Sequence, residues 1–306
     1  MNIKRRRLVG ILSRILITLI AVFVLAIGTL FLMQSGRDFD GVTIEAPGYT
    51  LNGSVSYGNN ANGPWVIFVH GNRKSGMAHP LYQMILHNLD ESVSVLAIDM
   101  RGFGASSVEG MAAADRILDR EQDIVAAAGW IKAEFGIDEE QIILIGHSLG
   151  ALQVLRAASN SPFGGVISIG PGAFEMFVRD SQARVEYRNK FERNTGIRLP
   201  TQTLIHDAQF LMLPRLLSPC PPGKMFVLHG SRETDMLNAR RRDIAADCDA
   251  RIEWHSIALS DHVYGTESRL PMPIAKIYSA FLGSMLMRRV NRSVSAVLES
   301  SDRGRR

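Results

Sequence analysis

The feature that most limits how this chain can fold is a turn of sequence Gly-His-Ser-Leu-Gly at residues 146–150, directly after the apolar run 141–145. The run is rich in β-branched residues, which is typical of a buried parallel strand, and residues 151–158 have the pattern of a helix. The two glycines, Gly146 and Gly150, lack a Cβ, so the strand and the helix can pass close to Ser148 without a collision. The pattern therefore predicts a sharp strand-to-helix turn that exposes Ser148.

A serine on such a turn can act as a nucleophile if other groups assist it. Its hydroxyl needs a base that accepts its proton, and the oxyanion that its attack creates needs N–H donors. The start of the following helix offers free N–H groups and the positive end of the helix dipole. A serine that only caps a helix after a buried strand is the alternative interpretation.

Strands and helices alternate along most of the chain. Strands are expected at 42–45, 49–57, 65–69, 93–98, 141–145, 166–169, 225–228 and 251–259, and helices at 80–89, 119–135, 151–158 and 274–289. This order predicts an α/β fold, with a mainly parallel sheet covered by helices on both faces. Residues 173–223, after the sixth strand, show no clear strand pattern, so we expect a helical insertion or lid there.

The N-terminus differs in composition from the rest of the chain. Residues 1–36 contain five basic and no acidic side chains, whereas the remainder holds 29 basic and 30 acidic ones, so nothing indicates a nucleic-acid-binding surface. Residues Ile15–Met33 are uncharged and would form a helix of roughly 28 Å, enough to cross a bilayer core. We expect an uncleaved single-pass anchor, with Lys4 to Arg7 cytoplasmic and the globular part extracytoplasmic. A cleaved signal peptide is the alternative.

The remaining residues are expected to form one globular domain and a tail. The apolar content of 46% is enough for a large core, which we place in residues 37–290. Residues 291–306 are polar and rich in arginine, and we expect a disordered tail there. No spacing of histidines and cysteines suggests a metal site, and no cofactor is predicted.

Polar motifs follow five of the expected strands. They are His-Gly-Asn at 70–72, Asp-Met-Arg-Gly-Phe-Gly-Ala-Ser at 99–106, the turn at 146–150, His-Gly-Ser-Arg-Glu-Thr-Asp at 229–235 and Ser-Asp-His at 260–262. In an open parallel sheet, ligands bind at the carboxyl ends of the strands. A serine, an acidic residue and a histidine thus appear in that order along the chain, each at the end of an expected strand.

These motifs resemble those of the α/β-hydrolase fold family, specifically its serine hydrolases, over residues 42–289. The resemblance implies that Ser148 is the nucleophile and His262 the general base. It also implies an oxyanion hole made by the backbone N–H groups of Asn72 and Leu149.

The acidic partner of the histidine is less closely defined by the motifs. The resemblance places it three residues after the glycine of the His-Gly turn, which is Glu233 here. Asp235 lies two residues further on and belongs to the residue type more common at this place in the family. Glu175, after the preceding strand, is a third candidate.

The function expected from these residues is that of a membrane-anchored serine hydrolase. It would cleave an ester, a thioester or an amide of a small or lipid-like acyl substrate through an acyl-enzyme intermediate. We expect a carboxylic ester first. A peptidase with the same fold is the second interpretation, and a membrane-tethered binding domain without catalysis is the third.

The two cysteines are expected to form a disulfide. Cys220 precedes the strand at 225–228 and Cys248 precedes the next one, at 251–259. Consecutive strands usually lie side by side, about 4.8 Å apart, which suits a disulfide. An extracytoplasmic domain would also favour the bond, at the edge of the sheet opposite the catalytic residues. Two unpaired thiols are the alternative.

Overall fold

The computed structural model describes residues 18, 37–60, 63–106, 120–196, 198–264, 266–267, 271 and 274–304. The predicted anchor, Ile15–Met33, lies outside these ranges apart from Thr18. Within the ranges given, no helix combines the length and the apolar character needed to span a bilayer.

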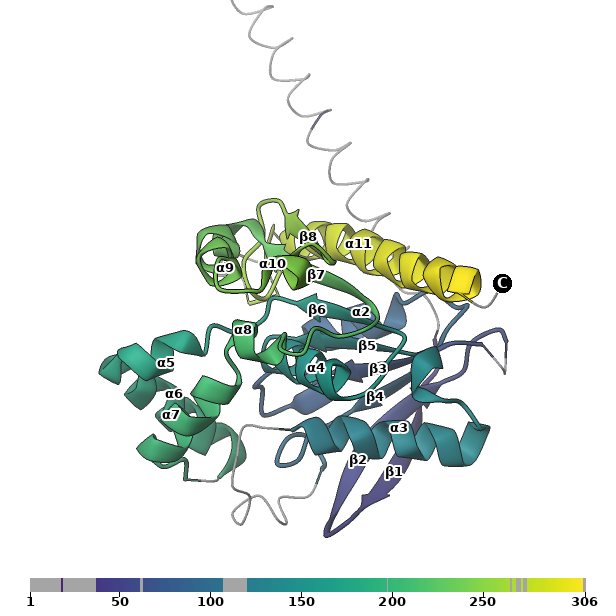
Figure 1. Cartoon of the computed structure of the whole chain (residues 1–306), viewed down its shortest axis with the longest axis horizontal. Coiled ribbons are helices and arrows are strands. Elements are labelled where there is room, and N and C mark those ends of the chain that lie inside the picture. The colour runs from purple at the N-terminus through teal and green to yellow at the C-terminus, as the bar shows by residue number, and fades with distance from the viewer. Residues whose placement is uncertain are drawn as a thin grey trace, which may run out of the picture.

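A sheet of eight strands forms the centre of the molecule, in the order β1-β2-β4-β3-β5-β6-β7-β8 (Figure 1). The strands are β1 (Asp40–Ala46), β2 (Tyr49–Ser56), β3 (Trp65–Val69), β4 (Ser94–Ile98), β5 (Ile142–His147), β6 (Gly165–Ile169), β7 (Lys224–Gly230) and β8 (Ile252–Ile257). Only β2 pairs antiparallel, with β1 and β4, and all other pairs are parallel. The predicted α/β fold with a mainly parallel sheet is confirmed.

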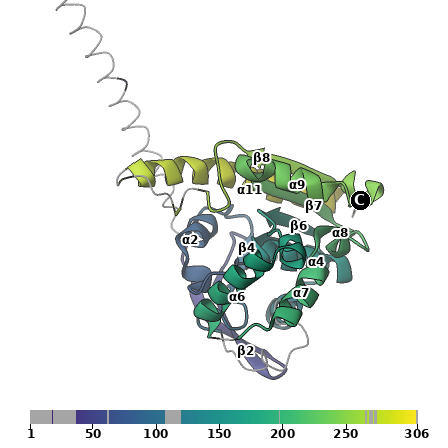
Figure 2. The ribbon, with the colours of Figure 1, turned by 90° about the vertical axis from the view of Figure 1, so that its left-hand side faces the viewer.

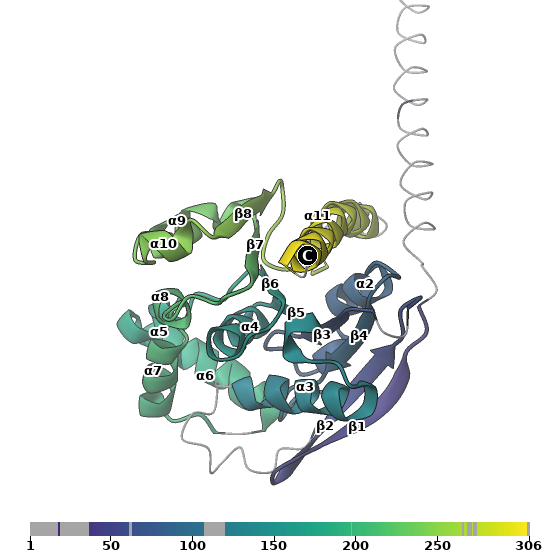
Figure 3. The same cartoon turned by 45° about the vertical axis from the view of Figure 1, so that its right-hand side comes forward.

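Helices cover both faces of this sheet, as Figure 3 shows. On one face lie α2 (Pro80–His87) and α11 (Ile274–Gly304), and on the other α3 (Glu121–Phe135) and α4 (Leu149–Asn160). Side chains on a strand alternate between the two faces, so Phe68 packs in the first layer and its neighbour Val69 in the second. The strand β3 therefore has to be apolar at every position, and all of it is buried.

The interval between β6 and β7 is helical, as predicted, and the helices lie together at one end of the molecule (Figures 1 and 2). They are α5 (Glu175–Arg179), α6 (Ser181–Thr195), α7 (Thr201–Phe210) and α8 (Leu213–Leu216). The side chain of Asp180 caps α6 by accepting two backbone N–H groups, and Gly196, in a left-handed conformation, ends it. Aromatic rings hold the insertion together, because Tyr187 and Phe177 lie 4.5 Å apart between ring centroids.

Short elements complete the fold, namely η1 (Gly76–Ala78), η2 (Glu139–Gln141), η3 (Ser231–Glu233), α9 (Thr234–Arg241) and α10 (Ala246–Asp249). The prediction of a disordered tail from residue 291 is wrong for residues 291–304, because α11 continues to Gly304. Val294 and Val297 are buried, and the Val297 side chain lies against Gly165 of β6. One apolar stripe is enough to hold an otherwise polar segment on the sheet as a helix.

Cys220 and Cys248 are joined by a disulfide, with their Cα atoms 5.6 Å apart. Each lies a few residues before its strand, β7 or β8, and these strands pair in parallel. The bond therefore ties two neighbouring strands at their amino ends.

Candidate active site

Ser148 lies at the tip of a sharp turn between β5 and α4. Its φ of 58° is in a region that residues other than glycine rarely adopt. The Ser148 N–H donates to the carbonyl of Ile169 at 2.9 Å, which fixes the turn to the neighbouring strand. A Cβ on Gly146 would overlap the carbonyl of Gly150, and a Cβ on Gly150 would overlap that of Val69. Only glycine fits at either position, so the strained turn depends on both.

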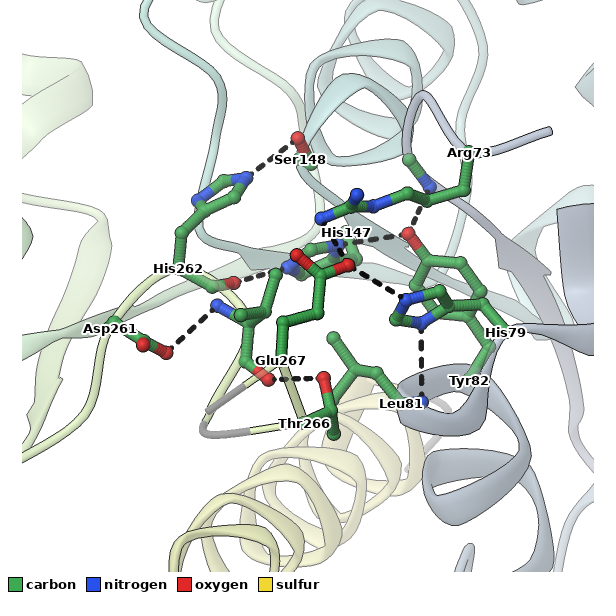
Figure 4. Close-up of polar contacts among 12 residues, drawn as sticks. Arg73, His79, Leu81, Tyr82, His147, Ser148, Asp261, His262, Thr266 and Glu267 are labelled. Carbon is green, nitrogen blue, oxygen red and sulfur yellow. Dashed lines mark hydrogen bonds and ion pairs between the residues drawn. The ribbon is translucent and has the colours of Figure 1, made fainter. Parts of the chain in front are cut away.

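A chain of two hydrogen bonds connects Ser148, His262 and Glu233. The distance from Ser148 Oγ to His262 Nε2 is 2.8 Å, and His262 Nδ1 lies 2.7 Å from Glu233 Oε1. The second carboxylate oxygen, Oε2, accepts the N–H of Gly230 at 3.1 Å. Since a carboxylate only accepts, Nδ1 carries the proton and Nε2 is free to accept the one on Ser148. The geometry suits a histidine that removes a proton from a serine hydroxyl (Figure 4 shows the Ser148–His262 contact).

The other two acidic candidates lie elsewhere. Asp235 is exposed in the first turn of α9, where its charge faces the positive end of the helix dipole. Glu175 forms an ion pair of 2.9 Å with the buried Arg240. Of the three carboxylates, the structure brings only Glu233 to His262.

The two residues expected to form the oxyanion hole, Asn72 and Leu149, belong to segments that lie next to Ser148. Leu149 begins α4 directly after the serine. A Cβ on Gly71 would lie 2.8 Å from the Cβ of Ser148, so the absence of a side chain there lets the loop with Asn72 approach the serine closely. Neither N–H donates a hydrogen bond to any of the residues that the structure describes. Two free donors beside a serine hydroxyl can hold an oxyanion.

Comparison with known families identifies the fold. The model of the Alpha/beta hydrolase family matches residues 66–298 of the chain. The chain belongs to this family. The matched span begins within β3 and ends within α11, and it contains Ser148, Glu233 and His262.

Two curated relatives of this alpha/beta hydrolase align over a limited part. Protein phosphatase methylesterase 1 of Schizosaccharomyces pombe is 34% identical over 103 residues, which cover 33% of this chain and 29% of that protein. The uncharacterized protein YfhR of Salmonella typhimurium is 32% identical over 95 residues, which cover 31% and 30%. The chain spans less than a third of the length of either relative.

Solved structures share the fold over most of the chain. Est1E of Butyrivibrio proteoclasticus, solved with ferulic acid bound, has a TM-score of 0.56 at 16% identity, covering 81% of this chain and 99% of its own. An esterase of Pyrococcus furiosus gives 0.54 at 17%, covering 82% and 91%. A serine hydrolase of Xanthomonas campestris, described as lacking a lid, gives 0.51 at 17%, covering 82% and 94%. Identities this low show a common fold alone.

The sequence did not indicate a role for His147, the residue directly before the nucleophile. The structure places its ring against that of His262, with centroids 4.9 Å apart. Its Nε2 lies 2.8 Å from the carbonyl oxygen of His262, so this nitrogen carries the proton and donates. Burial lowers the pKa of His147 well below its usual range, and the neighbouring His262 adds to the effect. The buried imidazole is therefore neutral and supports the backbone of His262 (Figure 4).

Tyr82 extends this support to the other side of the site. The Tyr82 hydroxyl lies 3.2 Å from Nδ1 of His147 and donates its proton to this nitrogen. The hydroxyl oxygen in turn accepts a hydrogen bond of 2.9 Å from the N–H of Gly71. Hydrogen bonds thus run from the loop beside Ser148 to the backbone of His262 through two buried side chains. The position of His147 next to the serine was the one available signal, since a buried imidazole at a strand end needs partners.

A second, exposed contact joins the same two loops at the surface (Figure 4). Arg73 Nη2 lies 2.7 Å from Oε1 of Glu267, and His79 Nε2 lies 3.3 Å from the same oxygen. The Glu267 side chain is 44% exposed, so solvent screens its ion pair with Arg73, and the contribution of this pair to stability is small.

No group of three potential metal ligands occurs in the part of the chain that the structure describes.

Proposed function

We propose that this alpha/beta hydrolase is a serine esterase that works through an acyl-enzyme. The observation that carries the proposal is the hydrogen-bonded chain Ser148–His262–Glu233, with distances of 2.8 and 2.7 Å. Ser148 Oγ attacks the ester carbonyl and passes its proton to His262 Nε2, while the N–H groups of Asn72 and Leu149 hold the oxyanion.

The reaction is completed in two stages, formation of the acyl-enzyme and its hydrolysis. His262 returns the proton to the departing alcohol, which leaves the acyl group on Ser148. A water molecule, deprotonated by His262, attacks the acyl-enzyme, and His262 returns that proton to Ser148 Oγ as the bond to the acyl carbon breaks and the carboxylic acid leaves. Glu233 keeps Nδ1 protonated and stabilises the imidazolium that forms in each stage.

The names of the similar proteins favour an ester over a peptide as the substrate. The names of two similar proteins refer to esterase activity, a methylesterase and an esterase of Pyrococcus furiosus, and a third similar protein, Est1E, was solved with ferulic acid. A fluorophosphonate probe tests the nucleophile: we expect labelling of the wild type and none of Ser148→Ala. Esters of graded acyl length then define the substrate. Absence of both labelling and ester hydrolysis in the folded wild type would instead favour a binding domain.

We also propose that residues 15–33 anchor the enzyme in a membrane, with the hydrolase domain on the extracytoplasmic side. The support is the length of this uncharged segment and the basic residues Lys4 to Arg7 before it. Reporter enzymes fused after Arg306 test this orientation. Activity of a reporter that works only in the cytoplasm would contradict it.

A further inference from the structure

The last helix of the chain, α11, has a buried face and an exposed face. Its buried side chains belong to the apolar layer that it shares with α2 and the central strands. The exposed side chains include Phe281, Arg288, Arg292 and Ser295, which are spaced by seven, four and three residues. Residues at these spacings lie on one side of a helix. Figure 3 shows α11 at the outside of the molecule beside α2, so this side of the helix faces away from the sheet.

The segment that follows the proposed anchor is fixed beside α11. Arg37 Nη2 donates to the carbonyls of Asp90 and Val93, at 2.8 and 2.5 Å, in the turn before β4. Asn291 of α11 binds the same turn, because its Oδ1 accepts the N–H of Asp90 at 3.3 Å and its Nδ2 donates to the carbonyl of Asn88 at 3.0 Å. One turn thus holds both Arg37 and the middle of α11.

This attachment limits the distance between α11 and the membrane. The proposed anchor ends at Met33, four residues before Arg37, and an extended chain spans at most about 3.6 Å per residue. Arg37 therefore lies within about 14 Å of the end of the anchor. Asn291 directly precedes Arg292 on the helix, so the exposed face of α11 includes the corner of the domain that is held close to the bilayer.

The exposed face is basic over most of its length. Between residues 274 and 298 the helix contains four basic and no acidic side chains, namely Lys276, Arg288, Arg289 and Arg292. Glu299, seven residues after Arg292, is the first acidic residue of α11. Asp90 and Glu91 are exposed on the turn before β4, where the charge of Arg37 offsets them in part. The helix therefore offers an excess of positive charge to an anionic surface.

Large apolar side chains are exposed near the start of the same helix. Phe281 is 49% exposed, and Leu259, which follows β8, is 65% exposed. The carbonyl of Leu259 accepts the hydroxyl of Tyr278, one turn before Phe281, at 2.7 Å, so the loop that leads to His262 lies against the helix. Basic side chains bind lipid phosphates and apolar ones enter the boundary with the acyl chains, so a helix that carries both suits a membrane surface.

We propose that the exposed face of α11 docks on the membrane in which the chain is anchored. Arg288 and Arg292 bind the phosphate groups of anionic lipids, and Phe281 enters the boundary between headgroups and acyl chains. The helix then lies along the bilayer, with its middle at the anchor and its start, beside Leu259, near the catalytic edge of the sheet. This inference rests on the anchor proposed above and adds the orientation of the domain.

A fluorescent probe on the helix tests the docking. The two native cysteines form the disulfide, so Ser295→Cys adds a single free thiol on the exposed face, and Ala133→Cys adds one on α3, across the sheet. The full chain, labelled at the thiol, is reconstituted in vesicles of phosphatidylcholine with phosphatidylglycerol that contain a lipid with a spin-labelled headgroup. We expect strong quenching of the probe at position 295, little quenching at position 133, and less quenching at position 295 in high salt.

Charge variants test the role of the arginines. Arg288→Gln combined with Arg292→Gln should lower the ratio of docked to free domain, read from the quenched fraction, by about fivefold for each arginine. Arg179→Gln combined with Arg193→Gln is the matched control, because both are exposed cations of the insertion, and it should leave the ratio unchanged. Vesicles of phosphatidylcholine alone should give quenching as low as that of the double variant at the helix.

The outcomes separate the docking from the anchor. A chain that floats with the vesicles after an alkaline wash, without quenching at position 295, would keep the anchor and overturn the docking. A chain that the wash removes would reject the anchor, and the same labelled chain mixed with anionic vesicles at low salt would still decide on the face. Equal quenching with and without phosphatidylglycerol, or shielding of the probe by dimers in detergent, would overturn the assignment to anionic lipid.

Discussion

Strands β7 and β8 are neighbours that are tied together at both ends, but in different ways. At their carboxyl ends, Glu233 follows β7 and His262 follows β8, and the two share a hydrogen bond of 2.7 Å. At their amino ends, Cys220 and Cys248 share a disulfide, with Cα atoms 5.6 Å apart. The same pairing of strands thus positions a noncovalent contact at one edge of the sheet and a covalent one at the other.

The difference follows from what each contact has to do. The proposed reaction moves a proton onto His262 and off again. Glu233 must therefore form a favourable contact with both the neutral and the protonated imidazole of His262. The disulfide carries no such demand and restricts the unfolded chain whether or not the enzyme is turning over. Changes at the carboxyl edge should therefore alter the rate, and changes at the amino edge should alter stability.

The largest effect on rate is expected from the nucleophile and its base. Ser148→Ala and His262→Ala should each lower kcat by about 10⁴-fold or more with the fold intact, since each removes a group from the reacting chain. The double variant should be little slower than either single one. Steady-state kinetics and circular dichroism measure the two properties, and ordinary activity in folded Ser148→Ala would end the proposed mechanism.

A smaller loss is expected at the carboxylate. Glu233→Gln should lower kcat by about 10²–10⁴-fold, because the amide no longer stabilises the imidazolium of His262. Asp235→Asn provides the matched control two residues away, and its kcat should remain near that of the wild type. The assignment of Glu233 is wrong if Asp235→Asn is the slower of the two.

His147→Gln tests the buried support of His262, and we expect kcat to fall by about tenfold because the carbonyl of His262 loses its fixed donor. A pH series adds a second readout. The pKa of His147 is lowered in the folded protein, so the unfolded chain binds a proton at this side chain below about pH 6.5 that the folded protein does not. The free energy of unfolding therefore decreases at this side chain as the pH falls below about 6.5.

The free energy of unfolding of the wild type should accordingly decrease between about pH 7.5 and pH 5, and the decrease should be smaller in His147→Gln. Urea denaturation at each pH measures it. Identical pH dependence in the two proteins would show that His147 is not held neutral by burial.

The smallest effect on rate is expected at the disulfide. Cys248→Ser should lower the free energy of unfolding by about 2–4 kcal/mol, since it releases a loop of 28 residues in the unfolded chain. The kcat at a temperature where both proteins are folded should not change. A marked loss of kcat in the folded variant would mean that the two edges of these strands are coupled.

The local signals in the sequence were strong where the backbone allows little choice. Gly146 and Gly150 predicted the serine turn because no other residue fits there, and the eight strands followed from runs of apolar, β-branched residues. The order of the strands also placed His262 and the two cysteines. The end of α11 was missed because its buried valines are spaced among polar residues and their partner, Gly165, is distant in sequence.

The residue pattern was therefore sufficient to predict the fold class, the position of Ser148 and the edge of the sheet at which the other groups gather. The choice among Glu233, Asp235 and Glu175 required the three-dimensional arrangement, because the three carboxylates have similar local signals and only Glu233 contacts His262. The same holds for the buried contacts of His147. Periodicity specifies which face of an element is buried, whereas a polar contact between elements depends on where separate segments meet.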